Sequence, residues 1–345
     1  MLNALVQRCV GAVLLAAPLI AASPALPTYR VATSIPAPDG GWDLTSVDAN
    51  GRRLYIARTD SILALDLASN RVSPAVIPAQ RGHDAFAIPG TREVLSTNGT
   101  SNTAVIFDGF TGAIRETIPV GKKPDAVAYD PLTRMVWIMN ADSGDISIVD
   151  PRVAKVVATV PVGGSLELGV ADGNGMMFVN VEDRNDVAVF DTRTRRLVKR
   201  FPLAGCDGPT GITYAPEAQL LVSACANGRA IVSTRSGREV ANLTIGMRPD
   251  GALYDSKRHV ALIPSGGDGT LAVIRLDGTP RIVETLKTAR GARTAALDPV
   301  TGRVYLSAVD YGPSDTAKRP KAVPGTFRVL VVEPIIRLSA KSHRP

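Results

Sequence analysis

The chain has 345 residues, a formal net charge of +7 and an aromatic content of 5%. This length permits two domains, but a repeat of about 42 residues occupies nearly all of it and leaves no linker for a second one. The basic residues are scattered apart from one short run, KRPK at 318–321, so we do not expect a nucleic-acid-binding protein.

Residues 1–25 have the features of a secretory signal peptide. Arg8 supplies a positive charge, residues 9–22 form an apolar run that is short for a membrane span, and SPA at 23–25 provides small residues for cleavage. We expect cleavage after Ala25, a periplasmic or secreted protein, and no transmembrane segment after cleavage. An uncleaved anchor is the alternative, but no stop-transfer pattern follows the apolar run.

A short apolar strand that ends in an acidic residue recurs along the chain. The acids are spaced by 41 or 42 residues and are Asp66, Asp108, Asp150 and Asp191. The apolar part continues before Ser233 and Arg275, and the pattern ends at Glu333. A repeat of this length made of short strands is typical of a propeller blade. The seven copies predict an all-β fold, a seven-bladed β-propeller of four-stranded blades at 26–336, followed by a C-terminal tail at 337–345.

The third copy shows the strands of one blade most clearly. Turn residues separate four runs of strand length and β-branched composition, at 125–130, 135–140, 145–150 and 155–162. Corresponding second strands are expected at 54–58, 94–98, 177–181, 220–224, 260–264 and 304–308.

The outer strand of the last blade lies at the other end of the chain. Residues 30–36 (RVATSIP) match the outer strand at 155–161 (KVVATVP) and precede the first inner strand. We therefore predict that the N-terminal segment pairs with residues 328–333. Such pairing closes the ring with hydrogen bonds and covers an otherwise exposed sheet edge.

The repeat motifs resemble those of a known family. PDAVA at 124–128, VWIMN at 136–140, IVD at 148–150 and VATVPVG at 157–163 are similar to the YVTN repeat of YncE-like seven-bladed propellers. The resemblance covers about residues 29–335. It implies a propeller fold and an exported location. It implies no particular reaction, because the family has no single established activity.

Two cysteines remain after signal cleavage. Cys206 precedes the inner strand of blade five and Cys225 ends the second strand of that blade, so the alternation of strand direction places both on the same face. In an oxidising compartment this arrangement predicts a disulfide. Two free thiols are the alternative, and a metal site is disfavoured because no histidine is near in sequence.

The first residues of the inner strands reach that same face. The aligned positions are Asp43, Asp84, Asp125, Glu167, Thr210, Asp250 and Arg293, and Trp42 and His83 precede two of them. Carboxylates crowded at a channel mouth could bind a cation, an amine or a sugar, and crowding would raise some of their pKa values. The alternative is that these acids cap turns by accepting backbone N–H bonds.

Histidines are too few for the common metal and haem centres. The chain has only His83, His259 and His343, and it contains neither a GxSxG elbow nor a CxxCH haem site. We therefore expect no metal and no cofactor.

The function that we expect is non-enzymatic. It is a monomeric binding or scaffold protein that holds a small molecule, an ion, or a periplasmic or outer-membrane protein on this rim. The alternatives are a lactonase-like hydrolase, in which His83, Asp84 or Asp125 would supply a base, and a cofactor-free accessory subunit of a periplasmic redox enzyme.

Blade seven is longer than the others. Its third strand ends 58 residues after that of blade six, which indicates an insertion of 16 residues at about 310–326, between the second and third strands. Long loops on a rigid scaffold often bind ligands, and this loop belongs to the rim that carries the acids. A disordered decoration is the alternative, given its Pro, Lys and Gly content.

Overall fold

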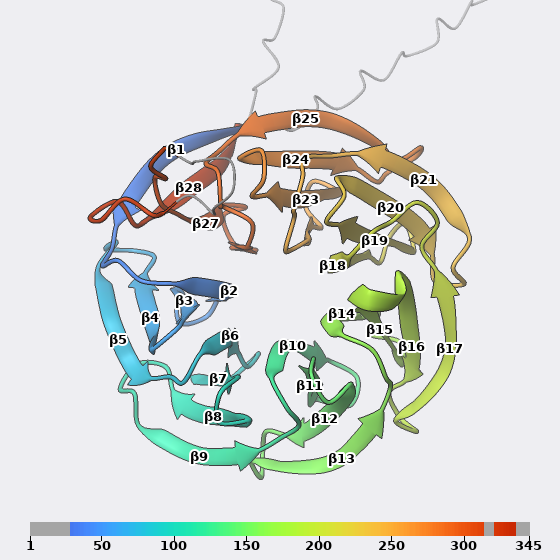
Figure 1. Ribbon diagram of the computed structural model, residues 1–345, viewed down its shortest axis with the longest axis horizontal. Helices are drawn as coiled ribbons and strands as arrows, with labels where there is room; N and C mark the ends of the chain where they lie inside the picture. The colour runs from blue at the N-terminus through green and yellow to red at the C-terminus, as the bar shows by residue number, and fades with distance from the viewer. Residues whose placement is uncertain (1–27, 314–320, 336–345) are drawn as a thin grey trace, which may run out of the picture. The chain divides into compact units, whose positions relative to one another are not determined.

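The computed structural model describes residues 28–313 and 321–335, which form 28 β-strands and one short 3-10 helix, η1 (Glu182–Arg184). The strands make seven antiparallel sheets of four strands each, arranged as blades in a ring (Figure 1). The seven-bladed propeller predicted from the repeat is confirmed. The predicted signal peptide at 1–25 and tail at 337–345 lie outside the described residues. The described part contains no helix with the length and hydrophobicity needed to cross a bilayer.

The first four blades keep the regular repeat. From the inside outward, blade one has β2 (Trp42–Asp48), β3 (Arg53–Arg58), β4 (Ser61–Asp66) and β5 (Val72–Pro78). Blade two has β6 (Gly82–Ala87), β7 (Glu93–Asn98), β8 (Thr103–Asp108) and β9 (Ile114–Pro119). Blade three has β10 (Pro124–Asp130), β11 (Met135–Asn140), β12 (Asp145–Asp150) and β13 (Lys155–Pro161). Blade four has β14 (Leu166–Ala171), β15 (Met176–Val181), β16 (Asp186–Asp191) and β17 (Arg196–Pro202).

The inner strands of the last two blades are shorter. Blade five has β18 (Pro209–Ala215), β19 (Leu220–Cys225), β20 (Arg229–Thr234) and β21 (Glu239–Thr244). Blade six has β22 (Leu253–Asp255), β23 (Val260–Ser265), β24 (Thr270–Arg275) and β25 (Arg281–Lys287). Blade seven has β26 (Ala295–Leu297), β27 (Val304–Ala308), β28 (Arg328–Ile335) and β1 (Thr28–Pro36).

The acid at the end of the third strand in blades one to four has a local structural role. Asp66 Oδ1 accepts hydrogen bonds from the backbone N–H groups of Ala68 and Ser69, at 3.1 and 2.8 Å. Asp108 and Asp191 bind the amides of their own turns in the same way. A short carboxylate that accepts these bonds stabilises the turn into the outer strand. This explains why the repeat is most visible at this position.

The ring is closed by strand pairing between the two ends of the propeller. β1 is antiparallel to β28, with partners from Thr28 and Ile335 to Pro36 and Arg328. The inner strands contact one another around the whole ring, and β26 of blade seven contacts β2 of blade one. The predicted contribution of the N-terminal segment to the last blade is therefore present in the structure.

Apolar side chains between neighbouring blades form the core. Trp137 of β11 is fully buried and lies edge to face with Phe190 of β16, with ring centroids 5.8 Å apart. Between blades five and six the backbones approach more closely, because a Cβ atom on Gly211 would lie only 2.4 Å from the carbonyl carbon of Gly251. Glycine at position 211 permits this contact between β18 and the segment that leads into β22.

The predicted disulfide joins Cys206 to Cys225, with Cα atoms 5.4 Å apart. It links the connection that precedes β18 to the end of β19, and both cysteines are buried. The bridge therefore holds one rim of blade five.

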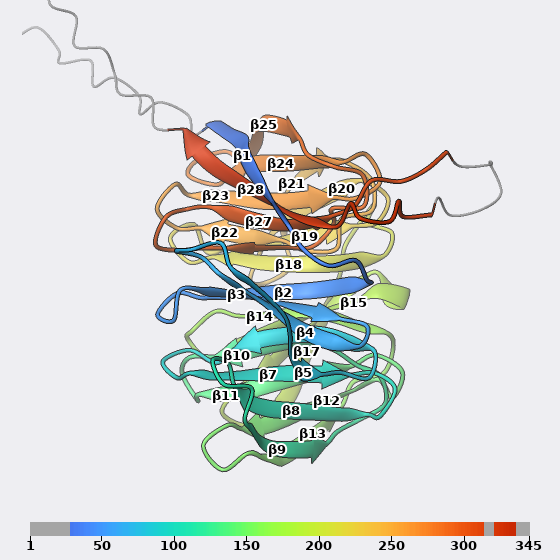
Figure 2. The ribbon, with the colours of Figure 1, turned by 90° about the vertical axis from the view of Figure 1, so that its left-hand side faces the viewer.

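The described part of the blade-seven loop extends from one rim of the ring (Figure 2). Its base is attached to the segment that precedes β2, because Asp39 accepts hydrogen bonds from the backbone N–H groups of Gly325 and Phe327, at 2.5 and 3.2 Å. Tyr311 forms an antiparallel bridge with Ala322. The loop base therefore lies on the rim where the inner strands begin.

Candidate ligand-binding site at the channel mouth

The inner strands surround a central cavity of about 430 Å³, which we call the central channel. Residues from all seven blades line it. The walls are mainly apolar and include Leu44, Phe86, Val127, Leu168, Ile212 and Leu253. Asp84 and Asp250 are the carboxyl groups in this lining. An apolar cavity with a few polar groups at one end is the usual form of a small-molecule site.

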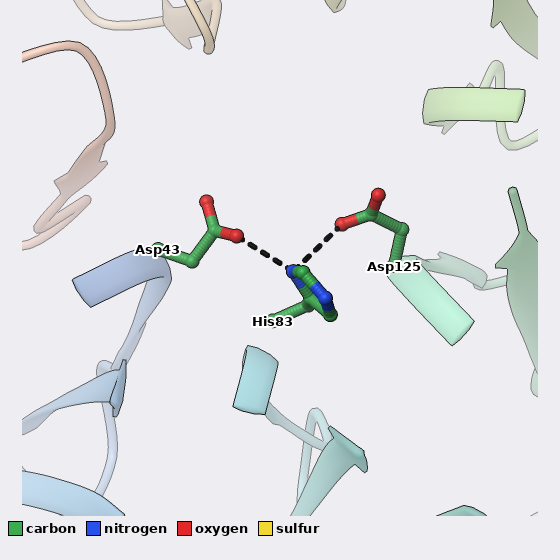
Figure 3. Close-up of side chains that lie close together, drawn as sticks. All are labelled: Asp43, His83 and Asp125. Carbon is green, nitrogen blue, oxygen red and sulfur yellow. Dashed lines mark hydrogen bonds and ion pairs between the residues drawn. The ribbon is translucent and has the colours of Figure 1, made fainter. Parts of the chain in front are cut away.

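Three predicted site residues from adjacent blades meet at the mouth of the channel. Asp43 of β2, His83 of β6 and Asp125 of β10 point toward one another (Figure 3). His83 Nδ1 lies 2.8 Å from Asp43 Oδ2 and 3.3 Å from Asp125 Oδ1. The imidazole is 7% exposed and therefore links the first three blades from a buried position. These three side chains also have the donor types and spacing of a possible metal site.

The second nitrogen of His83 points away from the two carboxylates (Figure 3). His83 Nε2 is buried, and no group in the described ranges accepts or donates a hydrogen bond to it. A Cβ atom at Gly99 would lie 2.7 Å from this nitrogen, so the glycine provides the space that the ring occupies. Nδ1 is therefore the nitrogen through which His83 contacts the acids of the channel mouth.

Basic side chains extend the cluster in both directions. Lys123 Nζ lies 3.4 Å from Asp125 Oδ2. Arg293 Nε donates a hydrogen bond to Asp250 Oδ2 at 2.5 Å, and its terminal nitrogen is 3.6 Å from Asp43 Oδ1. Burial raises the pKa of Asp250 to about 6, although the Arg293 guanidinium opposes the shift. The mouth thus carries a continuous chain of charged and polar side chains contributed by five blades, which runs from Lys123 through Asp125, His83, Asp43 and Arg293 to Asp250.

Asp84 lies beside this cluster but is 5% exposed. Its Oδ2 atom accepts a hydrogen bond from the backbone N–H of Val127 at 2.9 Å, which joins blade two to blade three. Its own backbone N–H donates to Thr97 Oγ1 at 2.9 Å. Burial raises the pKa of the Asp84 carboxyl group to about 8, against the effect of the Val127 hydrogen bond. Asp84 is therefore a buried carboxyl group that joins two blades by accepting a hydrogen bond.

Glu167, at the start of β14, differs from the other acids of the rim. Its side chain is partly exposed, and its carboxyl group makes none of the hydrogen bonds or ion pairs found within residues 28–313 and 321–335. Burial, followed by repulsion from Asp125 and Asp250, raises its pKa to about 9. It is an acid at the mouth without a counter-ion from these parts of the protein.

Two residues of the predicted rim, one at an aligned position and one just before an aligned position, have structural contacts instead. Trp42 packs against Phe327 with ring centroids 5.3 Å apart, in the core between blades one and seven. Thr210 Oγ1 donates to the carbonyl oxygen of Pro249 at 2.9 Å. The structure thus brings Asp43, His83 and Asp125 together, and it places Trp42 in the packing behind them.

The sequence reasoning did not identify Lys123 or the apolar channel wall. Lys123 lies two residues before an aligned acid, so the rim alignment could have included it. The wall residues follow the aligned positions on the inner strands, but their inward direction depends on the twist and bulges of those strands.

The acids that cap turns in the structure are different from the acids at the channel mouth. The side chains of Asp43 and Asp125 lie beside His83, whereas Asp66 and Asp108 bind the amides of the turns that follow them. Asp84 accepts an amide hydrogen bond, but from the neighbouring blade. The repeat therefore separates acids that cap turns from acids that face the channel mouth.

The raised pKa of Asp84 predicts a dependence of stability on pH. An ordinary unfolded aspartate loses its proton near pH 4, whereas Asp84 keeps it to about 8 in the folded state, so folding stability falls as the pH rises across this window. In Asp84→Asn the decrease in folding stability between about pH 4 and 8 should be smaller by an amount on the order of a few kcal/mol, because one pKa unit corresponds to about 1.4 kcal/mol. Urea unfolding of both proteins between pH 4.5 and 8.5 measures the difference.

Asp84→Ala is the matched control for this experiment. It removes the acceptor of the Val127 amide and should lower stability at every pH by about 1 to 3 kcal/mol. Parallel stability curves for the wild type and Asp84→Asn would contradict the assignment of a buried, neutral Asp84.

No known family profile matches the chain. No curated protein matches its sequence either. Among solved structures, the chain is similar to Kuenenia stuttgartiensis hydrazine synthase, with a TM-score of 0.66, 14% identity, and coverage of 81% of this chain and 96% of that chain. A chain of the mitotic checkpoint complex is similar with a TM-score of 0.72 and 14% sequence identity, and the match covers 95% of this chain and 99% of that chain. U3-55K is similar with a TM-score of 0.74 and 11% sequence identity, and the match covers 89% of this chain and 98% of that chain. At these low sequence identities the similarity concerns the fold alone. The fold of this chain is that of the seven-bladed β-propellers.

Proposed function

We propose that the protein is an exported, non-enzymatic binding propeller that holds a small ligand at the mouth of its central channel. The observation that carries this proposal is the meeting of Asp43, His83, Asp125 and Arg293 above an apolar channel. Charged groups from separate blades, placed over an apolar cavity, can orient one end of a ligand while the walls cover the other.

Three features support an exported protein of the YVTN-repeat type. They are the signal-like residues 1–25, the repeat motifs around 124–163, and the disulfide between Cys206 and Cys225. Disulfides persist in the periplasm and outside the cell, where thiols are not kept reduced. This location is also where a soluble binding propeller would meet ligands from the surroundings.

The geometry of His83 favours binding over lactone hydrolysis. A general base must come within hydrogen-bonding reach of the proton that it removes. His83 Nε2 is buried against Gly99, and Nδ1 is already in contact with Asp43 and Asp125. Asp84 is buried and bonded to the Val127 amide. The candidate bases of the hydrolase alternative are therefore engaged in contacts within the protein.

A ligand screen tests the proposed function. The mature protein is heated in the presence of divalent metals, lactones, sugars, amines and quinones, and a compound that binds the native state raises its melting temperature. Asp43→Asn and Asp125→Asn should each weaken binding of a hit by about tenfold or more, because each removes a charged hydrogen-bonding partner.

The control variant for the screen is Glu239→Gln, which changes an exposed acid on the outer strand β21. It should leave ligand affinity unchanged. A hit whose affinity is the same in Asp43→Asn and Asp125→Asn would contradict the location of the site. Hydrolysis of a lactone by the wild-type protein would favour the enzyme instead.

A further inference from the structure

The balance of charges at the channel mouth indicates the sign of the ligand. Four partly exposed carboxyl groups lie there, and the basic side chains in contact with them are Lys123 and Arg293; the acids are Asp43, Asp125, Glu167 and Asp250. Asp84 and Asp250 also line the channel itself, and Asp84 is 5% exposed. Acidic groups therefore extend from the rim into the channel wall.

The two cations are already paired, whereas one acid is not. Lys123 contacts Asp125, and Arg293 contacts Asp250 and Asp43. Glu167 makes no ion pair within the described ranges, and both Asp125 and Asp250 raise its pKa by repulsion. An anion that entered the mouth would have to displace an existing partner of Lys123 or Arg293. A cation at Glu167 would displace no ion pair, only the proton that this carboxyl group carries below about pH 9.

The wall below the mouth indicates the rest of the ligand. Leu168 follows Glu167 on the same strand and lines the channel with Phe86, Val127 and Ile212. A hydrated metal ion would leave these side chains uncovered. A hydrocarbon group would remove their apolar surface from water, and each buried methylene contributes about 0.8 kcal/mol.

Building on the proposed binding function, we propose that the ligand is an organic amine with an apolar body. Its ammonium group lies at Glu167, on the rim that also carries Asp125 and Asp250, and its hydrocarbon part enters the channel. The volume of about 430 Å³ is in the range of ordinary small-molecule sites.

Binding of this cation is linked to release of a proton. The charged groups that act on Glu167 come from several elements and are Asp125 of β10, Asp250 before β22, Glu182 of η1 and Lys123 before β10. Burial and the three acids hold the pKa of Glu167 at about 9, against the effect of Lys123, so an ammonium group beside it favours loss of its proton below that pH. Affinity for an amine should therefore rise between pH 6 and 9, while an alkylamine, like lysine at about 10.4, stays charged.

Isothermal titration with a matched series of compounds tests the inference. The compounds are butylamine, hexylamine and octylamine, with hexanol, hexanoate and calcium chloride as comparisons. We expect the amines to bind with affinity that rises up to about fourfold per methylene. Hexanol and hexanoate should bind at least about tenfold more weakly than hexylamine. Titrations of hexylamine at pH 7 in buffers of different ionisation enthalpy should reveal the released proton.

Two variants assign the effect to Glu167. Glu167→Gln should weaken hexylamine binding by about tenfold and abolish the dependence on the buffer, because it removes the group that loses the proton. Glu239→Gln on β21 should change neither quantity. Melting curves of both variants show whether they fold as the wild type does.

The possible outcomes separate this inference from the proposed function. Equal binding of hexanol or hexanoate, or unchanged hexylamine affinity in Glu167→Gln, overturns the assignment of an amine. Binding of calcium, together with amine affinities that do not change with the length of the alkyl chain, overturns the assignment of an amine in favour of a metal ion. If no amine binds but a sugar or lactone binds and depends on Asp43 and Asp125, the amine is wrong and the binding function stands. If neither the series nor the screen contains a ligand, both proposals fail.

Discussion

Deleting residues 26–36 should leave the last blade without β1 and cause marked destabilisation or aggregation of the protein. β1 pairs with β28 along its whole length, and Tyr29 and Ile35 are 2% and 7% exposed. Each buried side chain of this size contributes about 1.5 to 3 kcal/mol, so the loss should reach several kcal/mol. The deletion also uncovers β28 as a sheet edge that can pair with another chain.

Thermal unfolding by circular dichroism and size-exclusion chromatography measure the effect of this deletion. The control is Arg30→Ser, which removes an exposed ion pair between Arg30 and Glu333 but leaves the strand in place. That change should alter stability by less than about 1 kcal/mol. A deletion variant that melts at the wild-type temperature as a monomer would show that β1 is not needed to close the ring.

Loss of the disulfide between Cys206 and Cys225 should lower the free energy of unfolding by about 2 to 4 kcal/mol. The value should be about 3 kcal/mol, because the sequence separation of the two cysteines is 19 and the loop that the bridge closes is short. Urea unfolding of the Cys206→Ala, Cys225→Ala double variant beside the oxidised wild type measures the loss. The bridge holds a connection next to β18, so local opening should begin there.

Intact-mass measurement tests the bridge itself. Protein prepared from the periplasm should react with an alkylating reagent at two cysteines only after reduction. Alkylation of both Cys206 and Cys225 without a reductant would show that the protein lacks the disulfide. The melting temperature of the wild type should also fall when a reductant is present.

The blades could be predicted from the sequence because their pattern is local. The predicted strands at 135–140 and 145–150 agree with β11 and β12, and the match between 30–36 and 155–161 located β1. Each strand depends on its own composition and on turn acids such as Asp66, which bind amides two and three residues away. Interactions between residues so close in sequence can be predicted from a single repeat.

The candidate site could be predicted only in part. Alignment of the repeats placed Asp43, His83 and Asp125 on one rim, because the inner strands begin at equivalent positions. It did not distinguish Asp84, which is buried and bonded to the Val127 amide, from Glu167, which has no counter-ion within the described ranges. Both are acids at aligned positions, and their difference depends on groups contributed by other blades.

The sequence by itself determined the number of blades, their order, the closing strand and the rim on which the charged residues lie. Hydrophobic alternation and turn chemistry act over a few residues at a time and define each strand, and the constant repeat length makes the blades and the displaced closing strand recognisable in the linear sequence. The tertiary structure decided which side chains meet at the channel mouth. His83 and Asp43 are 40 residues apart, and Arg293 and Asp250 are 43 apart. Their contacts, burial and pKa values arise only when separate blades converge on one axis, because burial and charge act through space.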